Sequence, residues 1–171
     1  MREFETIWEA INFAFIKYGS LKRKSGDNLY VIHPIRVAMI LRAAGFSEFK
    51  DRNLMLASLF HDLLEDTNLT FDDLKAEFGT EIASIVKEVS KPENISKEEW
   101  LRAFGTSSKE AKLIKMADRI DNLMDMKLPE WTVEKQKNYA EQGLIILETC
   151  GKTSPKLANK LKKLIDKILN D

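Results

Sequence analysis

Hydrophobic residues recur at steps of three and four along almost the whole chain, which is the spacing that gives an α-helix one apolar face. Near the N-terminus this pattern comprises Phe4, Ile7, Trp8, Ile11 and Phe15. Near the C-terminus it comprises Leu157, Leu161, Leu164, Ile165 and Ile168. We find no segment with the two-residue alternation of a strand, no internal repeat and no low-complexity segment. The sequence therefore predicts an all-α protein of about eight to nine helices joined by brief loops.

Local signals predict where individual helices begin and end. Ser96 and Glu99 form a capping box, and Thr70 with Asp73 has the same arrangement of a cap and an acid three residues on. Pro34 can stand in the first turn of a helix, where its missing N–H costs nothing. The expected helices cover residues 4–18, 34–45, 53–61, 71–78, 80–89, 109–126 and 132–149, with others beginning after residue 96 and at residue 155.

Composition excludes several classes of protein. A chain of 171 residues is typical of one domain, so we expect a single domain over residues 1–171. The 27 Lys and Arg balance 27 Asp and Glu, which argues against a general nucleic-acid binder. The lone Cys150 has no intrachain disulfide partner, as fits a reducing compartment. Residues 37–41, the longest clean apolar run, are too few to span a membrane, and residues 1–10 show no secretory signal. We therefore expect a cytoplasmic protein without nucleic-acid or membrane partners.

The chain has two histidines, and one of them lies in a setting that suits a metal ligand. The pair His61-Asp62 follows the strongly apolar residues 54–60, so an ionisable pair stands where a buried helix ends. Neighbouring helical residues project about 100° apart, yet their side chains can still meet on one cation. A buried histidine with its own hydrogen-bond partner is the commoner explanation of such a pair taken alone.

The other histidine and a separate acid strengthen the metal interpretation. His33 precedes Pro34 at the mouth of a predicted helix, and Asp118 lies among apolar neighbours, so its charge is expected to point inward and need a partner. His33, His61, Asp62 and Asp118 together form a mixed nitrogen and oxygen set that suits Mn²⁺, Fe²⁺ or Zn²⁺. Four protein ligands on a cation that prefers six leave room for water and substrate, as a catalytic site requires.

The order of these ligands resembles the HD superfamily of metal-dependent phosphohydrolases. The residues RKSGD at 23–27, YVIHP at 30–34 and ASLFHDLLEDT at 57–67 resemble motifs of the RelA/SpoT alarmone hydrolases. Residues 78–90 and 108–123 extend the likeness, which is greatest to the small stand-alone hydrolases of the SpoT-homologue type. The EDT extension and the RKSG segment separate this family from other HD proteins. The resemblance implies a single HD-domain bundle around one metal site, without a synthetase or regulatory domain.

The resemblance also implies an activity and a set of roles. In the family, Mn²⁺ held by two histidines and two aspartates supports removal of the 3′-pyrophosphate from guanosine tetra- or pentaphosphate, that is guanosine 3′,5′-bis(diphosphate) or its 5′-triphosphate analogue, giving GDP or GTP and pyrophosphate. Carried over by motif, the metal ligands are His33, His61, Asp62 and Asp118. Glu65 and Asp66 become the catalytic acidic pair, and Glu65 would share the metal-facing side if the helix continues past His61. The nucleotide would be bound by Arg23, Lys24, Asn122 and Lys115.

Each of these assignments has a plainer alternative. Glu65 and Asp66 could be a solvated helix end, and Arg23 and Lys24 a solvated basic loop. Asn122 could brace Asp118 instead of binding the nucleotide. Lys115, the remaining substrate-binding residue, could extend to solvent instead of meeting a phosphate.

The function has alternatives as well. The substrate could be another nucleotide, such as the 2′-phosphate of NADPH or a dNTP, or the chain could be a binding module gated by metal or nucleotide. Two departures from the family concern the nucleotide pocket: Tyr18, Ser20 and Leu21 replace a common His-x-Gly-Gln segment, and Asp125 replaces a threonine of the long enzymes. The apolar face of the last helix could close the core or pair subunits in a homo-oligomer.

Overall fold

The computed structural model describes residues 2–23, 27–125 and 131–170, with side chains from residue 6 onward. The elements in chain order are α1 (Arg2–Tyr18), α2 (Ile32–Ala44), α3 (Arg52–Phe60), α4 (Leu63–Asp66), α5 (Phe71–Phe78), α6 (Thr80–Val89), α7 (Lys97–Ala103), α8 (Lys109–Asp125), α9 (Val133–Cys150) and α10 (Pro155–Asn170), with short 3₁₀ turns after α7 and α9. Within the described ranges there is no strand, only an isolated antiparallel bridge between Lys22 and Leu29. The prediction of an all-α fold is confirmed.

The predicted capping signals operate as expected. Thr70 and Ser96 each accept a hydrogen bond from the backbone N–H of the acid three residues on, and the side chains of Asp73 and Glu99 bond back, so both capping boxes are complete. Gly45 closes α2 in the left-handed region with φ of 110°, a conformation that costs glycine little. The expected end of the 109–126 helix at Met126 lies just outside the described residues.

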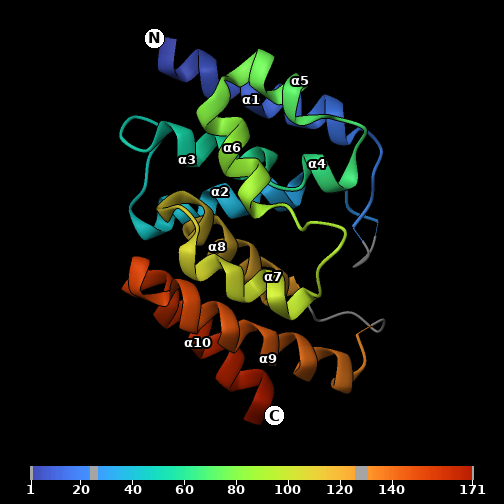
Figure 1. Ribbon diagram of the computed structural model, residues 1–171, viewed down its shortest axis with the longest axis vertical. Coiled ribbons are helices and arrows are strands. Elements are labelled where there is room, and N and C mark those ends of the chain that lie inside the picture. Colours follow the sequence, from blue (N-terminus) through green and yellow to red (C-terminus); the bar gives the residue numbers. More distant parts are fainter. Residues whose placement is uncertain (1, 24–26, 126–130, 171) are drawn as a thin grey trace.

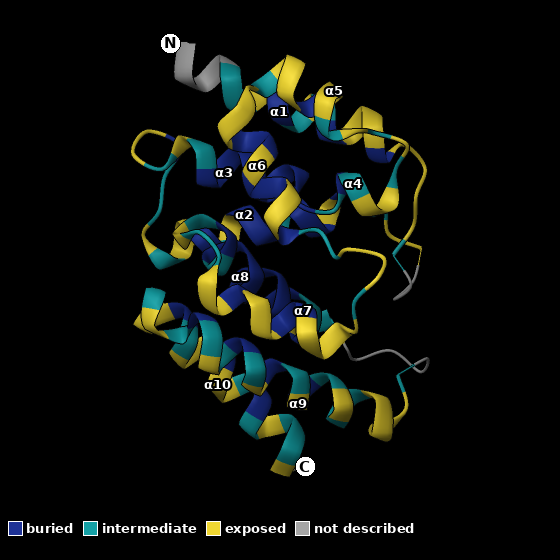
Figure 2. Ribbon diagram, viewed as in Figure 1, coloured by how far each residue is buried: buried dark blue, intermediate teal, exposed yellow. Residues whose placement is uncertain are grey.

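The helices form layers along the long axis of the molecule (Figure 1). α1 and α5 lie at the end that holds the N-terminus, α2, α3 and α6 form the next layer, and α9 and α10 lie at the other end. α8 lies between them and packs against α2, α6, α9 and α10. Figure 2 shows that burial is concentrated in the middle layers, and all residues of 54–60 on α3 and 113–121 on α8 are buried. The site residues therefore come from the most enclosed elements of the fold.

The chain between α3 and α4 departs from the expected geometry. The helix expected over residues 53–61 ends at Phe60, within one residue of its predicted end, and a turn at His61-Asp62 separates it from α4. The helix therefore does not continue past His61, which was the condition under which Glu65 would share the metal-facing side. Asp62 has φ of −103° and ψ of 0°, outside ideal helix geometry. The turn places two adjacent ionisable side chains at the edge of the core, and the single turn of α4 carries the acidic pair Glu65 and Asp66.

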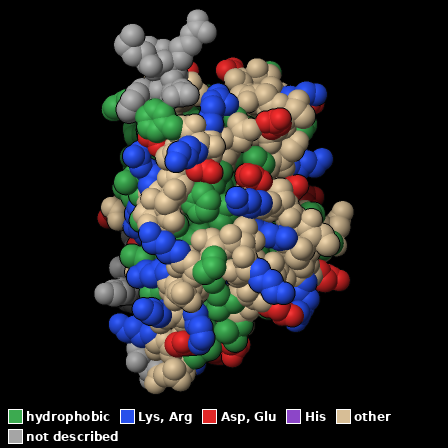
Figure 3. Space-filling view, turned by 90° about the vertical axis from the view of Figure 1, so that its left-hand side faces the viewer, with side chains coloured by type: hydrophobic (Ala, Val, Ile, Leu, Met, Phe, Trp, Pro, Cys, Tyr) green, Lys and Arg blue, Asp and Glu red, His purple; other side chains and the backbone are tan. Residues whose placement is uncertain are grey.

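The helices and the surface of the molecule bear on whether the protein could contact a membrane or a second subunit. No helix in the described part of the chain is long and apolar enough to cross a membrane. Leu157, Leu161 and Ile165 of α10 are buried, and α10 packs on α8 and α9, so its apolar face closes the core. On the face shown in Figure 3, basic and acidic side chains alternate with hydrophobic areas, and neither histidine is visible.

Replacing Leu161 by alanine should destabilise the fold by about 2–5 kcal/mol, because a fully buried leucine is truncated against α8 and α9. Urea unfolding followed by circular dichroism measures the change in the free energy of unfolding. The exposed Lys160→Ala variant on the same helix is the control and should change it by less than about 0.5 kcal/mol. Equal stability of the two variants would show that α10 does not close the core.

Candidate metal centre and pocket

Four of the predicted site residues meet at the centre of the fold. His33 stands in the first turn of α2, His61 and Asp62 in the turn after α3, and Asp118 in the middle of α8. One ligand atom from each of His33, His61 and Asp118 lies within 4.8 Å of the others. The Asp62 Oδ2 atom is 3.1 Å from Nε2 of His61 and 3.5 Å from Nε2 of His33. Residues far apart in sequence thus form one cluster of nitrogen and oxygen donors.

Each imidazole has a hydrogen-bond partner on the ring nitrogen that faces away from the cluster, and for His61 this partner is a backbone carbonyl. Nδ1 of His61 lies 2.8 Å from the carbonyl oxygen of Ser58, and because a carbonyl can only accept, Nδ1 carries the proton. Nε2 of His61 then has a lone pair, yet it is buried without a hydrogen-bond partner. Such an unpaired buried acceptor is costly unless a cation or donor meets it. The donor set and this lone pair together fit a divalent cation.

The two carboxylates are held by neighbouring donors. The Tyr30 hydroxyl donates to Oδ2 of Asp62 at 2.6 Å, and the Lys115 ammonium donates to Oδ2 of Asp118 at 2.9 Å. Burial alone would raise the pKa of Asp62, but the adjacent His61 and His33 hold it well below its ordinary value. Burial is likewise outweighed at Asp118, whose pKa is lowered by Lys115 and by a hydrogen bond with His33. Both groups are therefore anionic and can neutralise a cation.

The carboxylates around His33 give the cluster a strongly negative character. Burial lowers the pKa of His33, but hydrogen bonds with Asp118, Asp121 and Asp62 outweigh it and raise the pKa to about 10. Positive charge is thus favoured at this position, and a bound cation would supply it in place of the proton.

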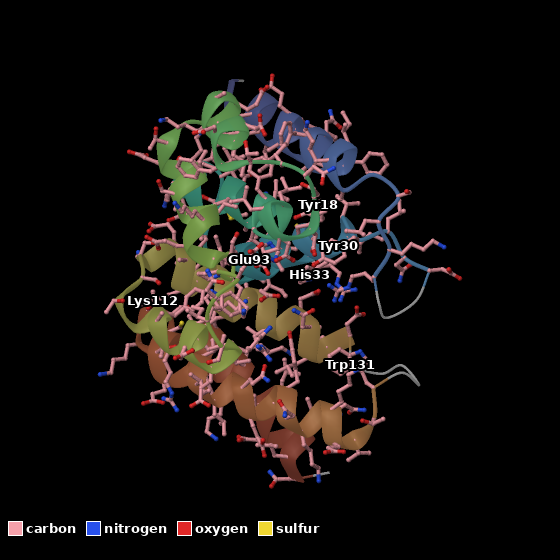
Figure 4. The ribbon with its side chains drawn as sticks, turned by 45° about the vertical axis from the view of Figure 1, so that its right-hand side comes forward. Tyr18, Tyr30, His33, Glu93, Lys112 and Trp131 are labelled. Atoms are coloured by element: carbon pink, nitrogen blue, oxygen red, sulfur yellow. The ribbon has the colours of Figure 1, made fainter. Side chains whose placement is uncertain are left out.

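The cluster lies at the wall of an open pocket of about 400 Å³. In Figure 4, Tyr18, Tyr30 and His33 lie together on one side of this region, and Trp131 lies on the other. The ring centroids of Tyr30 and His33 are 5.7 Å apart, which places the tyrosine directly beside the cluster. Besides cluster residues, the pocket is lined by Leu21, Lys22, Arg23, Tyr30, Glu65, Asp66, Lys97, Trp100, Lys115, Asn122, Asp125, Trp131 and Tyr139.

The predicted acidic pair lines this pocket, although α3 does not continue into α4. Oε1 of Glu65 accepts a hydrogen bond from the backbone N–H of Lys91 at 3.0 Å, which fixes the carboxylate at the rim. Partial removal from water, together with the charges of Asp62 and Asp66, raises the pKa of Glu65 despite that hydrogen bond. A carboxylate with a raised pKa accepts a proton more readily than an ordinary glutamate does.

The residues predicted to bind the substrate differ in whether their side chains are free to do so, because some already bond to other residues. Arg23 lines the pocket, but its guanidinium already donates to Asn122 at 3.0 Å and to Asp125 at 3.0 and 3.2 Å. The side-chain amide of Asn122 in turn donates to Asp118, as the bracing alternative requires. Lys115 is buried and lies 4.0 Å above the ring centroid of Trp100, so it does not extend to solvent. Lys24 lies outside the described residues.

Sequence reasoning missed several residues of the site. Asp121 contacts His33, and its position three residues after Asp118 on the same helix face could have indicated this. Tyr30 was noted only as part of a motif, although its hydroxyl holds a ligand. Trp131 and Tyr139, whose rings pack edge to face at 5.4 Å, belong to a part of the chain where no motif was found.

Comparisons with known proteins find an HD domain and relatives named for hydrolysis of guanosine-3′,5′-bis(diphosphate). A family model for the HD domain matches residues 10–148. The guanosine-3′,5′-bis(diphosphate) 3′-pyrophosphohydrolase MESH1 of Xenopus tropicalis is 34% identical over 163 residues, covering 91% of this chain and 90% of the relative. Its Homo sapiens counterpart is 33% identical over 171 residues, covering 95% and 94%. A solved structure, described as a metazoan ortholog of SpoT that hydrolyzes ppGpp, matches with a TM-score of 0.84 and 31% identity over 94% of this chain and 93% of that one.

Proposed function

Because the chain belongs to the HD domain family, we propose that it is a metal-dependent hydrolase that removes the 3′-pyrophosphate from guanosine 3′,5′-bis(diphosphate) or its pentaphosphate analogue. The products would be GDP or GTP and pyrophosphate. The observation that carries this proposal is the convergence of His33, His61, Asp62 and Asp118 beside a pocket that also holds an acidic pair. Relatives named for this reaction match over about nine-tenths of the chain.

The proposed metal ligands are His33, His61, Asp62 and Asp118, and we propose Mn²⁺ as the ion, with Fe²⁺ or Zn²⁺ as alternatives. A divalent ion bound there would act as a Lewis acid and offset negative charge on the phosphorus oxygens. Geometry supports this set because the first turn of α2, the turn at His61-Asp62 and α8 bring the side chains together. Ligand atoms of His33, His61 and Asp118 lie within 4.8 Å of one another, and Oδ2 of Asp62 lies 3.1 Å and 3.5 Å from the Nε2 atoms of the two histidines.

The acidic pair supplies the proton transfer in this proposal. As the new oxygen–phosphorus bond forms and the bond to the 3′ oxygen breaks, the 3′ oxygen takes a proton from solvent in the open pocket and leaves as the ribose hydroxyl, while Glu65 accepts the proton of the attacking water. Its raised pKa and its fixed position at the rim suit that role. Asp66, which also lines the pocket, is the second acid of the proposed pair.

In this proposal a few basic side chains and two aromatic side chains bind the nucleotide. Lys115 and Arg23 place positive charge beside the pocket, Asn122 braces Asp118, and Lys24 remains a proposed phosphate contact. Trp131 and Tyr139 present aromatic surfaces on which a base can stack. A bound metal ion together with these basic side chains would allow a chain of zero net charge to bind a polyanion. We further propose one domain over residues 1–171 and a cytoplasmic location.

The decisive experiment compares turnover of ppGpp, a dNTP and NADPH by the purified protein supplied with Mn²⁺. We expect ppGpp to be hydrolysed with the highest kcat/KM and to release pyrophosphate rather than phosphate. Faster turnover of NADPH or the dNTP would assign a different nucleotide to the same metal centre. Metal and ppGpp binding without turnover of any substrate would instead indicate a binding module.

A further inference from the structure

Asp121 connects the metal cluster to two arginines, and it has no role in the proposed reaction so far. It lies on α8 three residues after Asp118 and is only 2% exposed. Its Oδ2 atom is 2.7 Å from Nδ1 of His33, on the side of the imidazole that faces away from the cluster. Its Oδ1 atom accepts a hydrogen bond from Nε of Arg36. Each carboxylate oxygen therefore has a different partner.

Two arginines surround this buried carboxylate. The Arg23 guanidinium lies 3.6 Å from Oδ2 of Asp121, and Arg36 bonds Oδ1 directly. Both arginines also pair with Asp125, at 3.0 and 3.3 Å. A buried acid is costly unless its charge is paired, and here two guanidiniums pair it. The arginines therefore hold Asp121 in place with Oδ2 against Nδ1 of His33.

We propose that Asp121 is the positioning residue for His33: its carboxylate keeps the imidazole proton on Nδ1 and so turns the Nε2 lone pair toward the bound metal. A carboxylate on the outer nitrogen of a metal-binding histidine fixes the tautomer and ring orientation and makes the inner nitrogen a better donor. The inference deepens the proposed function, on which it rests, by identifying what sets the affinity of the metal centre.

The second histidine provides an internal comparison. Nδ1 of His61 faces the neutral carbonyl of Ser58, whereas Nδ1 of His33 faces a charged carboxylate. The same orientation is thus enforced twice, but only His33 gains electron density from an anion. His33 should accordingly be the stronger donor of the two, and its strength should depend on one side chain that is not itself a ligand.

Asparagine at this position should do more than remove a charge. Arg36 can only donate, so the oxygen of an Asp121→Asn side chain would turn to Arg36 and its NH₂ group would face His33. That NH₂ group would favour the tautomer with the proton on Nε2, which cannot bind a metal. The Asp121→Asn variant should therefore bind metal at least as poorly as Asp121→Ala does.

Affinity for Zn²⁺ and Mn²⁺, measured by competition with a chromophoric chelator, tests the inference without any substrate. We expect about 10- to 100-fold weaker binding by Asp121→Asn and Asp121→Ala. Asp125→Asn is the matched control, because it removes an acid that pairs with the same two arginines, and its loss should be less than about threefold. Arg36→Ala is the second control: it retains the contact between Asp121 and His33, so it should also keep most of the affinity.

Nuclear magnetic resonance reads the tautomer directly. Because the chain has 2 histidines, ¹⁵N-histidine labelling of the Zn²⁺ complex gives two imidazoles to resolve. The wild-type protein should show a protonated Nδ1 and a metal-bound Nε2 on both, and Asp121→Asn should lose this pattern for His33 alone, with the fold intact by circular dichroism. Wild-type affinity and an unchanged His33 pattern in Asp121→Asn would overturn the inference, as would losses in Asp125→Asn and Arg36→Ala equal to its own.

These outcomes are separable from those of the substrate experiment. Metal binding that depends on Asp121, in a protein that does not hydrolyse ppGpp, would support this inference and contradict the proposed substrate. A wild-type protein that binds neither ion would overturn both.

Discussion

Replacing Asp62 by alanine should strip the divalent metal from the purified protein and reduce hydrolysis of ppGpp to the background rate. The Asp62 carboxylate lies between the two imidazoles, 3.1 Å from Nε2 of His61 and 3.5 Å from Nε2 of His33. Its removal takes an anionic donor from the cluster and leaves the Tyr30 hydroxyl without its acceptor. We expect a larger loss of affinity than the about 10- to 100-fold caused by removing a partner outside the ligand set.

Metal content after dialysis, measured by inductively coupled plasma mass spectrometry, checks this expectation independently of any substrate. Asp72→Ala, which removes an exposed aspartate on α5 that belongs neither to the cluster nor to the pocket lining, is the control and should retain the metal. Thermal unfolding of both variants shows whether the fold survives. A folded Asp62→Ala protein that keeps one ion per chain would remove Asp62 from the ligand set.

The sequence was most informative where local chemistry decides the structure. Periodicity predicted the helices, and the capping boxes at Thr70 and Ser96 marked their starts correctly, because both depend on residues within one turn. The end of α3 was predicted to within one residue, but the short helix α4 that follows the turn at His61-Asp62 was not predicted. A helix of one turn is too short to show a hydrophobic period of its own, and Leu63 and Leu64 simply continue the apolar pattern of α3.

Contacts between distant segments account for what sequence reasoning missed. Asp121 contacts His33, which lies 88 positions away in the sequence, because α2 packs against α8. Arg23 donates a hydrogen bond to Asp125, 102 positions away in the sequence, and no motif indicated this contact. Whether a charged side chain faces a ligand or another residue depends on which helices pack together, whereas the spacing of residues along one helix shows only which of them share a face.

Glu65→Gln should retain the metal and the fold but lower kcat for ppGpp by about 10²- to 10⁴-fold, the range typical of losing a general base. The amide has the size of the carboxylate, and its oxygen can still accept the hydrogen bond that the Lys91 backbone donates at 3.0 Å. It cannot take a proton from water, so only the chemical step should suffer. KM should change little, because Glu65 is assigned to proton transfer and not to binding the nucleotide.

Steady-state kinetics and metal analysis of the same preparations separate this variant from Asp62→Ala, which should lose the ion as well. Glu93→Gln makes the same chemical change at an exposed acid on the loop between α6 and α7, and it should behave as the wild-type protein does. If kcat of Glu65→Gln instead stayed within about threefold of that control, Glu65 would be a solvated acid at the end of a helix. The proton acceptor would then have to be another group of the pocket, with Asp66 the first to test.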